Sequence, residues 1–332
     1  MTLEPTLHYL VCPQPAQLGI EPGAAPGTAN LTNGANVANG ASLPASRRMA
    51  YWSWGNPAHA HVVVCVHGIS RQGRDFDTLA RALVGPDGQR CRVVSVDIAG
   101  RGHSDWHTNP SLYAVPSYAV DMLALLAHLR AQEGAQTIDW VGTSMGGLIG
   151  IAVAPQLAMV AGAALRKLVL NDVGPVVQWS ALQRISSYIG ADPHFASEQE
   201  GADAMWKLST SFGPHTPAQW LALSKPMLRP VTDGSGGLFK LHYDPAISMP
   251  VKATTPELAA QGEAILWHLY DAITCDTLLV RGADSDLISP ATAQAMQARG
   301  PKAHLVEFTG VGHAPTLVAA DQVAAVTSFL FG

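Results

Sequence analysis

The sequence is poor in charged residues and has no uninterrupted hydrophobic run of membrane-spanning length. Charged residues make up 14% of the 332 positions, whereas hydrophobic residues make up 48%. This composition is typical of a chain that buries a large core, and it argues against an intrinsically disordered protein. Gly, Pro or polar residues interrupt each apolar stretch before it reaches the roughly 20 residues that a transmembrane helix requires. We therefore expect a globular protein without a membrane span.

Basic charge is equally scarce. The formal net charge is −5, and no Lys/Arg cluster is longer than the pair Arg47–Arg48. Proteins that bind nucleic acid need a positive surface to neutralise phosphates, so we expect no nucleic-acid partner. The first residues contain Glu4 and lack the basic region and long apolar run of a secretory signal, which predicts a cytoplasmic protein.

Cysteine is also rare, and none of the four residues forms a CxxC pair: Cys12, Cys65, Cys91 and Cys275. The thirteen histidines include no HExxH motif. Widely spaced cysteines favour neither a zinc site nor a disulfide framework. We therefore expect no metal and no other cofactor.

Short β-branched segments alternate with amphipathic segments from His61 onward. This alternation predicts βαβ units and an α/β fold with a mostly parallel sheet of about eight strands. The expected strands are 7–11, 49–54, 61–66, 92–97, 137–141, 167–171, 276–281 and 303–308. The expected helices are 75–84, 117–131, 145–157, 257–272, 290–299 and 316–330.

The alternation stops at about Gly174 and resumes near Thr255. Between them, aromatic and methionine residues occur among prolines and glycines. Residues 175–255 are therefore predicted to form a mostly helical cap inserted after the sixth strand, and residues 1–174 and 256–332 are predicted to form the core. Residues 13–46, which are dominated by Gly, Ala, Asn, Pro and Thr, are predicted to be a flexible loop.

A GxSxG motif, Gly142-Thr143-Ser144-Met145-Gly146, follows a predicted strand and precedes a predicted helix. A serine in a tight strand-to-helix turn is exposed for nucleophilic attack, and small neighbours allow strand and helix to approach each other. This context predicts that Ser144 is a nucleophile.

A serine hydroxyl needs a neighbouring base, and that base needs a third group to orient it. His313 follows the last predicted strand and is the candidate base. Asp286 follows the strand before it and is the first candidate for the acid. Asp172, at the end of the preceding strand, is the second candidate but is expected to shape the hinge of the cap instead. Asp284 is the third.

Two further motifs make the chain resemble the α/β-hydrolase superfamily, in its branch of capped serine esterases, lactonases and C–C-bond hydrolases. His67-Gly68 resembles the HG turn of that family, and residues 97–104 resemble its DxxGxGxS loop. The resemblance implies a triad of Ser144, Asp286 and His313. It also implies an oxyanion hole from the backbone N–H groups of Ile69 and Met145, with supporting turns at His67, Gly68, Gly142 and Gly146.

The resemblance implies two-step hydrolysis of a carboxylic ester or related acyl bond in a small to medium substrate, with water as the second reactant. A serine at the elbow argues against haloalkane dehalogenases and epoxide hydrolases, which use a carboxylate nucleophile. A C–C-bond hydrolase, an enol-lactonase or a lyase could use the same three residues. A non-catalytic ligand-binding protein with this fold is an alternative from another class.

Overall fold

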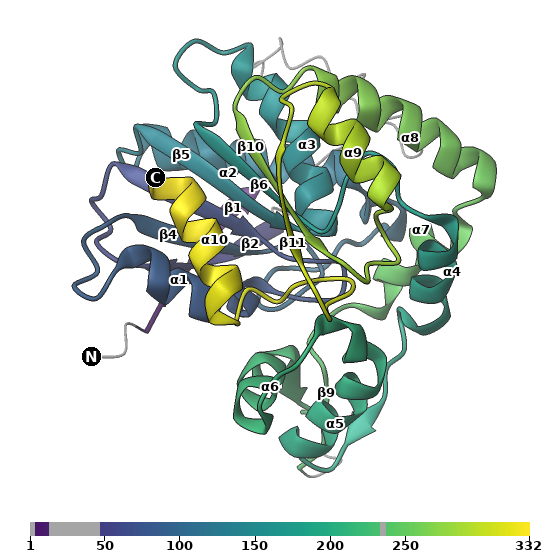
Figure 1. Ribbon diagram of the computed structural model, residues 1–332. Coiled ribbons are helices and arrows are strands. Elements are labelled where there is room, and N and C mark those ends of the chain that lie inside the picture. The colour runs from purple at the N-terminus through teal and green to yellow at the C-terminus, as the bar shows by residue number, and fades with distance from the viewer. Residues whose placement is uncertain (1–3, 13–46, 233–236) are drawn as a thin grey trace, which may run out of the picture.

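A central sheet of eight strands organises the chain (Figure 1). The computed structural model describes residues 4–12, 47–232 and 237–332, so the loop predicted at 13–46 lies outside the described residues. In sequence order the strands are β1 (Thr6–Cys12), β2 (Arg47–Trp54), β3 (His61–Val66), β4 (Arg92–Asp97), β5 (Thr137–Thr143), β6 (Lys167–Asn171), β10 (Asp276–Gly282) and β11 (His304–Phe308). Their spatial order is β1-β2-β4-β3-β5-β6-β10-β11.

The sheet is antiparallel at one edge and parallel elsewhere. β1 pairs antiparallel with β2, and β2 pairs antiparallel with β4, whereas every other neighbouring pair is parallel. The predicted α/β fold with a mostly parallel sheet of about eight strands is therefore confirmed. Because parallel strands present their carboxyl ends at one edge, the loops that follow β3, β5, β6, β10 and β11 lie near one another.

Alternating side chains of the strands enter two separate cores. In β3, Val62 and Val64 pack into one core, whereas Val63 and Cys65 pack into the other. This period of two is expected for an extended strand, and burial of both faces explains why the central strands are rich in valine, leucine and isoleucine.

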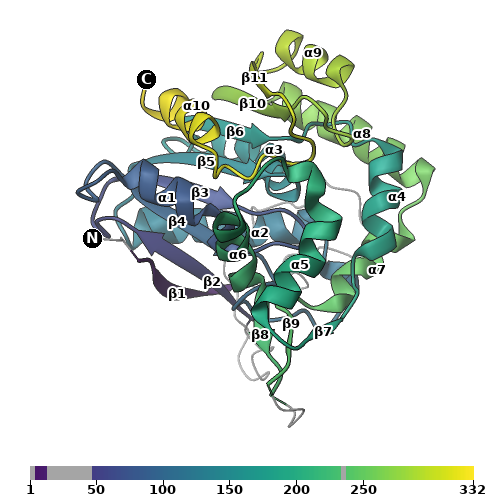
Figure 2. The ribbon, with the colours of Figure 1, turned by 60° about the horizontal axis from the view of Figure 1, so that its bottom comes forward.

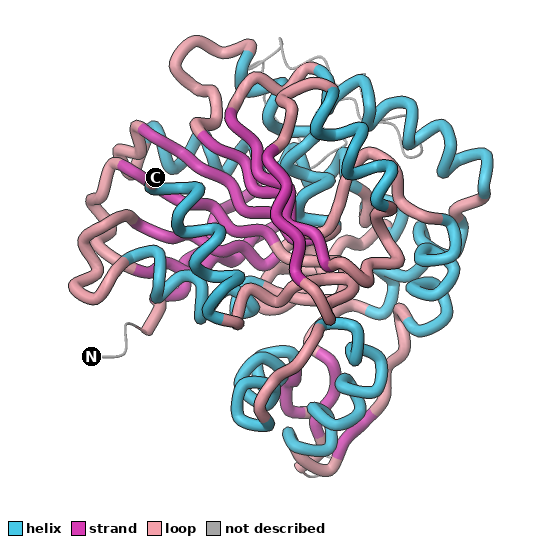
Figure 3. The backbone as a smooth tube through the Cα atoms, in the orientation of Figure 1, coloured by secondary structure: helices cyan, strands magenta, loops and turns pink. Residues whose placement is uncertain are grey.

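Helices cover both faces of the sheet (Figures 1 and 3). The first face carries α2 (Val115–Ala131), α3 (Met145–Ala158), α8 (Pro256–Asp271) and α9 (Pro290–Ala298), and the second carries α1 (Asp77–Val84) and α10 (Ala320–Phe331). Within the described ranges, no helix has both the length and the apolar character needed to cross a membrane.

The insertion, residues 175–255, joins β6 to α8. It contains α4 (Trp179–Tyr188), α5 (Glu198–Ser209), α6 (Pro217–Ser224) and α7 (Ser248–Ala253). It also contains a small antiparallel sheet of β7 (His194–Phe195), β9 (Phe239–Leu241) and β8 (Leu228–Pro230). The sequence predicted helices here but not these strands, because segments of two or three residues have too little length to show a periodicity. Figure 2 shows α5, α6 and the small sheet side by side, outside the central sheet.

Candidate active site

Ser144 occupies a strained turn between β5 and α3. Its backbone angles, φ 51° and ψ −118°, lie in a region that residues with a side chain rarely adopt. The flanking glycines make the turn possible. A Cβ atom at Gly142 would lie 2.4 Å from the carbonyl oxygen of Gly146, and one at Gly146 would lie 2.0 Å from that of Val66. Any larger residue at either position would push β5, α3 and β3 apart.

The structure places Ser144 beside His313, although 169 positions separate them in the chain. The hydroxyl oxygen of Ser144 lies 2.9 Å from Nε2 of His313. His313 belongs to the loop after β11, and its side chain is 11% exposed. A hydroxyl within hydrogen-bonding distance of an imidazole is the geometry required for proton transfer to a general base.

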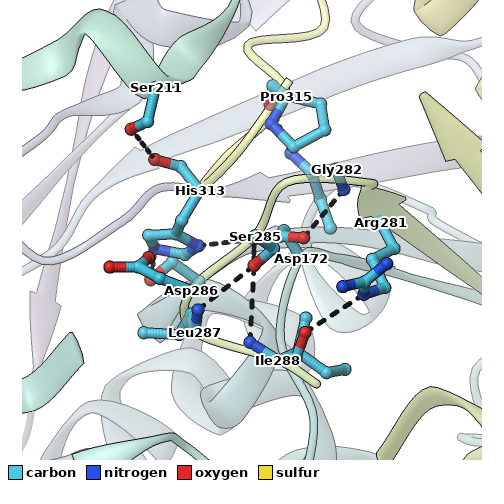
Figure 4. A network of polar contacts seen from close by, with 12 residues as sticks. Asp172, Ser211, Arg281, Gly282, Ser285, Asp286, Leu287, Ile288, His313 and Pro315 are labelled. Carbon is cyan, nitrogen blue, oxygen red and sulfur yellow. Dashed lines mark hydrogen bonds and ion pairs between the residues drawn. The ribbon is translucent and has the colours of Figure 1, made fainter. Parts of the chain in front are cut away.

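The carboxylate that faces His313 is Asp172, so the prediction that Asp286 faces it is wrong (Figure 4). Oδ2 of Asp172 lies 2.7 Å from Nδ1 of His313. The same oxygen accepts a hydrogen bond of 2.6 Å from the hydroxyl of Ser285, and Oδ1 accepts one of 2.9 Å from the N–H of Gly282. Asp172 is completely buried. Its carboxylate therefore has protein donors on both oxygens and a fixed orientation.

Asp286 pairs with an arginine instead of His313 and is exposed to solvent. Its side chain is 44% exposed and accepts two hydrogen bonds from Arg184 of α4, at 2.6 and 2.8 Å. Asp284, the third candidate, is exposed as well. Asp172 also does not act merely as a hinge of the insertion, since its side chain faces the imidazole.

The sequence could not choose between Asp172 and Asp286. β6 and β10 are neighbours in the sheet, so the residues that follow both strands lie near the loop of His313. The available signal was that Asp172 directly follows a strand end. Ser285 was not predicted as part of the site, although it directly precedes Asp286, the first candidate for the acid.

The turn after β3 lies directly against the nucleophile. A Cβ atom at Gly68 would be 3.6 Å from Cβ of Ser144. Within the described part of the chain, neither the N–H of Ile69 nor that of Met145 donates a hydrogen bond. Met145 is the first residue of α3, where the backbone N–H has no partner inside the helix. These two N–H groups are thus available to an oxygen atom of a ligand.

Two buried side chains hold this turn in place. Nδ1 of His67 lies 2.7 Å from the carbonyl oxygen of Gly68, and Nε2 accepts a hydrogen bond of 3.0 Å from the N–H of Ile98. Burial lowers the pKa of His67 to about 3, so the ring is neutral and Nδ1 carries the proton. Arg101, also fully buried, donates a hydrogen bond of 2.8 Å to the carbonyl oxygen of Ile69.

The insertion contacts the loop that carries His313. The N–H of Gly312 donates to the carbonyl oxygen of Ser211 at 2.6 Å. The hydroxyl of Ser211 donates to the carbonyl oxygen of His313 at 2.9 Å (Figure 4). Ser211 lies just after α5. The insertion therefore helps to position the imidazole as well as covering the site.

A cavity of about 170 Å³ opens onto Ser144 and His313. Most of its lining residues are apolar or aromatic residues of the insertion, namely Ile185, Tyr188, Ala191, Pro193, Phe195, Ala204, Met205, Leu208, Phe212, Met227, Leu241 and Tyr243. An apolar wall excludes water and strengthens the polar interactions within it. The described residues contain no group of three His, Cys, Asp or Glu side chains arranged to hold a metal ion, and all four cysteines are free thiols.

Comparison with known proteins gives consistent matches. A family model described as the alpha/beta hydrolase family matches residues 63–326. A 3-hydroxybutyrate-oligomer hydrolase from Cupriavidus necator is 46% identical over 285 residues, which cover 86% of this chain and 93% of that protein.

Two solved structures extend the match to three dimensions. An alpha/beta hydrolase from Novosphingobium aromaticivorans is 33% identical, with a TM-score of 0.71 and coverage of 86% of this chain and 94% of that one. A Rickettsia typhi protein is 26% identical, with a TM-score of 0.73 and coverage of 86% of this chain and 91% of that one.

Proposed function

The chain belongs to the alpha/beta hydrolase family, and from this premise we propose that it is a serine hydrolase that cleaves ester bonds between short 3-hydroxyacids. The observation that carries this proposal is the continuous contact from Ser144 through His313 to Asp172, at 2.9 and 2.7 Å. The three groups stand in the order that a nucleophile, a base and an orienting acid require.

In the first step, Ser144 attacks the ester carbonyl carbon while Nε2 of His313 takes its proton. Asp172 keeps the proton of the neutral ring on Nδ1 and stabilises the imidazolium that forms. The N–H groups of Ile69 and Met145 stabilise the negative charge on the carbonyl oxygen. The loss of one such donor typically costs about 3 kcal/mol of transition-state stabilisation.

The tetrahedral intermediate then collapses, and His313 gives its proton to the departing alcohol. A water molecule next attacks the acyl-enzyme while His313 acts as base again. This second step releases the acid and restores the hydroxyl of Ser144. No step needs a metal or another cofactor.

The choice of 3-hydroxyacid esters rests on the Cupriavidus necator relative, whose name gives 3-hydroxybutyrate oligomers as its substrate. The cavity is compatible with that chemistry, because each unit of such an oligomer carries a methyl group that an apolar wall can contact. We assign residues 175–255, which supply most of that wall, as the cap and the rest of the chain as the core.

The test is hydrolysis of linear 3-hydroxybutyrate dimers and trimers by the purified protein, with Ser144→Ala as the control. We expect release of 3-hydroxybutyrate by the wild type, and covalent labelling of the wild type but not of the variant by a fluorophosphonate. An unlabelled wild type without activity would indicate a ligand-binding protein. Activity on a vinylogous diketone acid but on no ester would indicate a C–C-bond hydrolase.

A further inference from the structure

The wall of the active-site cavity is asymmetric in charge. Two arginines, Arg71 and Arg184, are among the described residues that line it, and the same lining contains neither Asp nor Glu. The carboxylates that pair with these arginines, Asp75 and Asp286, are not part of that lining. A cavity that presents cations and no anions favours a ligand with negative charge.

Arg71 is the less available of the two cations. Its Nε and Nη2 atoms both donate to Asp75, and Nη2 also donates to the carbonyl oxygen of Leu223. Its side chain is only 11% exposed. Arg71 therefore serves to join the core to the insertion.

Within the described residues, Asp286 occupies only one edge of the Arg184 guanidinium group, and the hydroxyl of Tyr188 also lies within reach of that group. The Nε and Nη2 atoms of Arg184 donate to the two oxygens of Asp286 at 2.6 and 2.8 Å, and neither bond uses Nη1. The side chain is 37% exposed. A guanidinium group can bind one carboxylate through Nε and Nη2 and a second through Nη1 and Nη2, because its donors form a rigid planar fork.

Tyr188 stands one helical turn after Arg184 on α4 and lines the same cavity. Residues four apart on a helix lie on one face, so the phenol and the guanidinium group approach a ligand from the same side. Burial raises the pKa of Tyr188, although the neighbouring Arg184 guanidinium group acts to lower it, so the hydroxyl keeps its proton.

We propose that Arg184, held by Asp286 and accompanied by Tyr188, forms a subsite for the free carboxylate of the substrate. This inference rests on the proposed function and specifies how that substrate is recognised. In it, Asp286 is a positioning residue that fixes the guanidinium group, not a member of the triad.

The chemistry of a linear 3-hydroxyacid oligomer fixes the side on which this carboxylate lies. Such a chain has one free carboxylate, at its acid end, and cleavage of any ester bond leaves it on the half that departs as the alcohol. The bond from the carbonyl carbon to that alcohol oxygen breaks, and His313 protonates the oxygen. Arg184 therefore binds the leaving group, and the monomeric product should also bind there.

The test compares a 3-hydroxybutyrate dimer as the free acid with its methyl ester, which lacks the charge. We expect wild-type kcat/KM to favour the free acid, and Arg184→Gln to reduce that preference ratio by about 10- to 100-fold, as for one charge-assisted hydrogen bond pair. Arg184→Lys should keep part of the preference. We also expect 3-hydroxybutyrate to inhibit the wild type competitively and more strongly than its methyl ester does.

Arg299→Gln is the matched control. Arg299 also pairs with an aspartate through Nε and Nη2, and its side chain is 46% exposed, but it belongs to the segment after α9 and is not part of the cavity lining. This variant should retain the wild-type ratio.

Two results would overturn the inference in distinguishable ways. If the wild type cleaves the methyl ester as well as the free acid through Ser144, the subsite is refuted and the proposed function stands. If wild type and Ser144→Ala are equally inactive on both compounds, the proposed function fails and the subsite with it. Should Arg184→Gln not fold, the wild-type preference and the product inhibition decide the matter alone.

Discussion

Oδ2 of Asp172 lies 2.7 Å from Nδ1 of His313, across 141 positions of the chain. This contact joins the end of β6 to the loop after β11, and β10 lies between those two strands in the sheet. Gly282 and Ser285, which follow β10, donate to the same carboxylate. Three strand ends thus define the position of one side chain.

Asp172→Asn should reduce kcat by about 100- to 10,000-fold, because an asparagine cannot stabilise the imidazolium and can hold the ring in the wrong tautomer. Asp286→Asn should cost less than about tenfold on an uncharged ester, since Asp286 does not contact the ring. Steady-state kinetics with p-nitrophenyl butyrate would measure both. A larger loss for Asp286→Asn than for Asp172→Asn would restore Asp286 as the acid.

Ser285→Ala should lower kcat by about three- to tenfold, because it removes one of the hydrogen bonds that fix the Asp172 carboxylate, each worth about 1 kcal/mol. The same p-nitrophenyl ester assay applies. Ser285→Thr retains a hydroxyl and should recover most of the activity. Equal losses in both variants would show that the hydroxyl does not act through Asp172.

Gly146→Ala should destabilise the fold by about 2 kcal/mol or more, because the added Cβ would lie 2.0 Å from the backbone oxygen of Val66. Gly262→Ala provides the contrast, since a Cβ there meets no atom within 4 Å. Gly262 lies inside α8, where alanine is favoured over glycine, so this variant should gain about 0.5–1 kcal/mol. Urea unfolding would measure the stability of both variants. Equal free energies of unfolding for Gly146→Ala and Gly262→Ala would refute the packing argument.

His67 should make the protein sensitive to acid. Its pKa falls from 6.5 to about 3 on burial, so the unfolded chain binds a proton that the folded chain does not bind. The contribution of the neutral, buried ring to the free energy of unfolding is complete above pH 6.5. It is lost as the pH falls from there towards 3. The stability of the wild type relative to His67→Gln should therefore fall by up to about 1.4 kcal/mol per pH unit.

Urea titrations of both proteins between pH 7 and pH 4 would show this difference. The comparison with His67→Gln is needed because buried carboxylates with a raised pKa change the free energy of unfolding with pH in the direction opposite to His67. Burial raises the pKa of Asp97 to about 6, which favours the folded state as the pH falls. Asp97 is common to both proteins, so its contribution cancels. A difference that does not change with pH would show that His67 does not titrate as its burial implies.

The main elements of the core could be predicted because their signals are local. Strands 61–66, 92–97 and 167–171 were predicted with the bounds that the structure has, since each strand is almost wholly buried and has valine or leucine residues in its centre. The short strands of the insertion could not be predicted, because two or three residues form a sheet only through partners that are distant in sequence.

The sequence alone determined the α/β fold and the position of Ser144 in a glycine-flanked turn, because a strand, a turn and a helix leave local patterns. It also predicted His313 as the partner of Ser144, from the place of His313 after the last strand and from the family resemblance. Only the tertiary structure decided that Asp172 faces the imidazole and that Asp286 binds Arg184. Both aspartates follow neighbouring parallel strands, and the choice between them depends on burial, backbone direction and the cation that α4 brings to the exposed one.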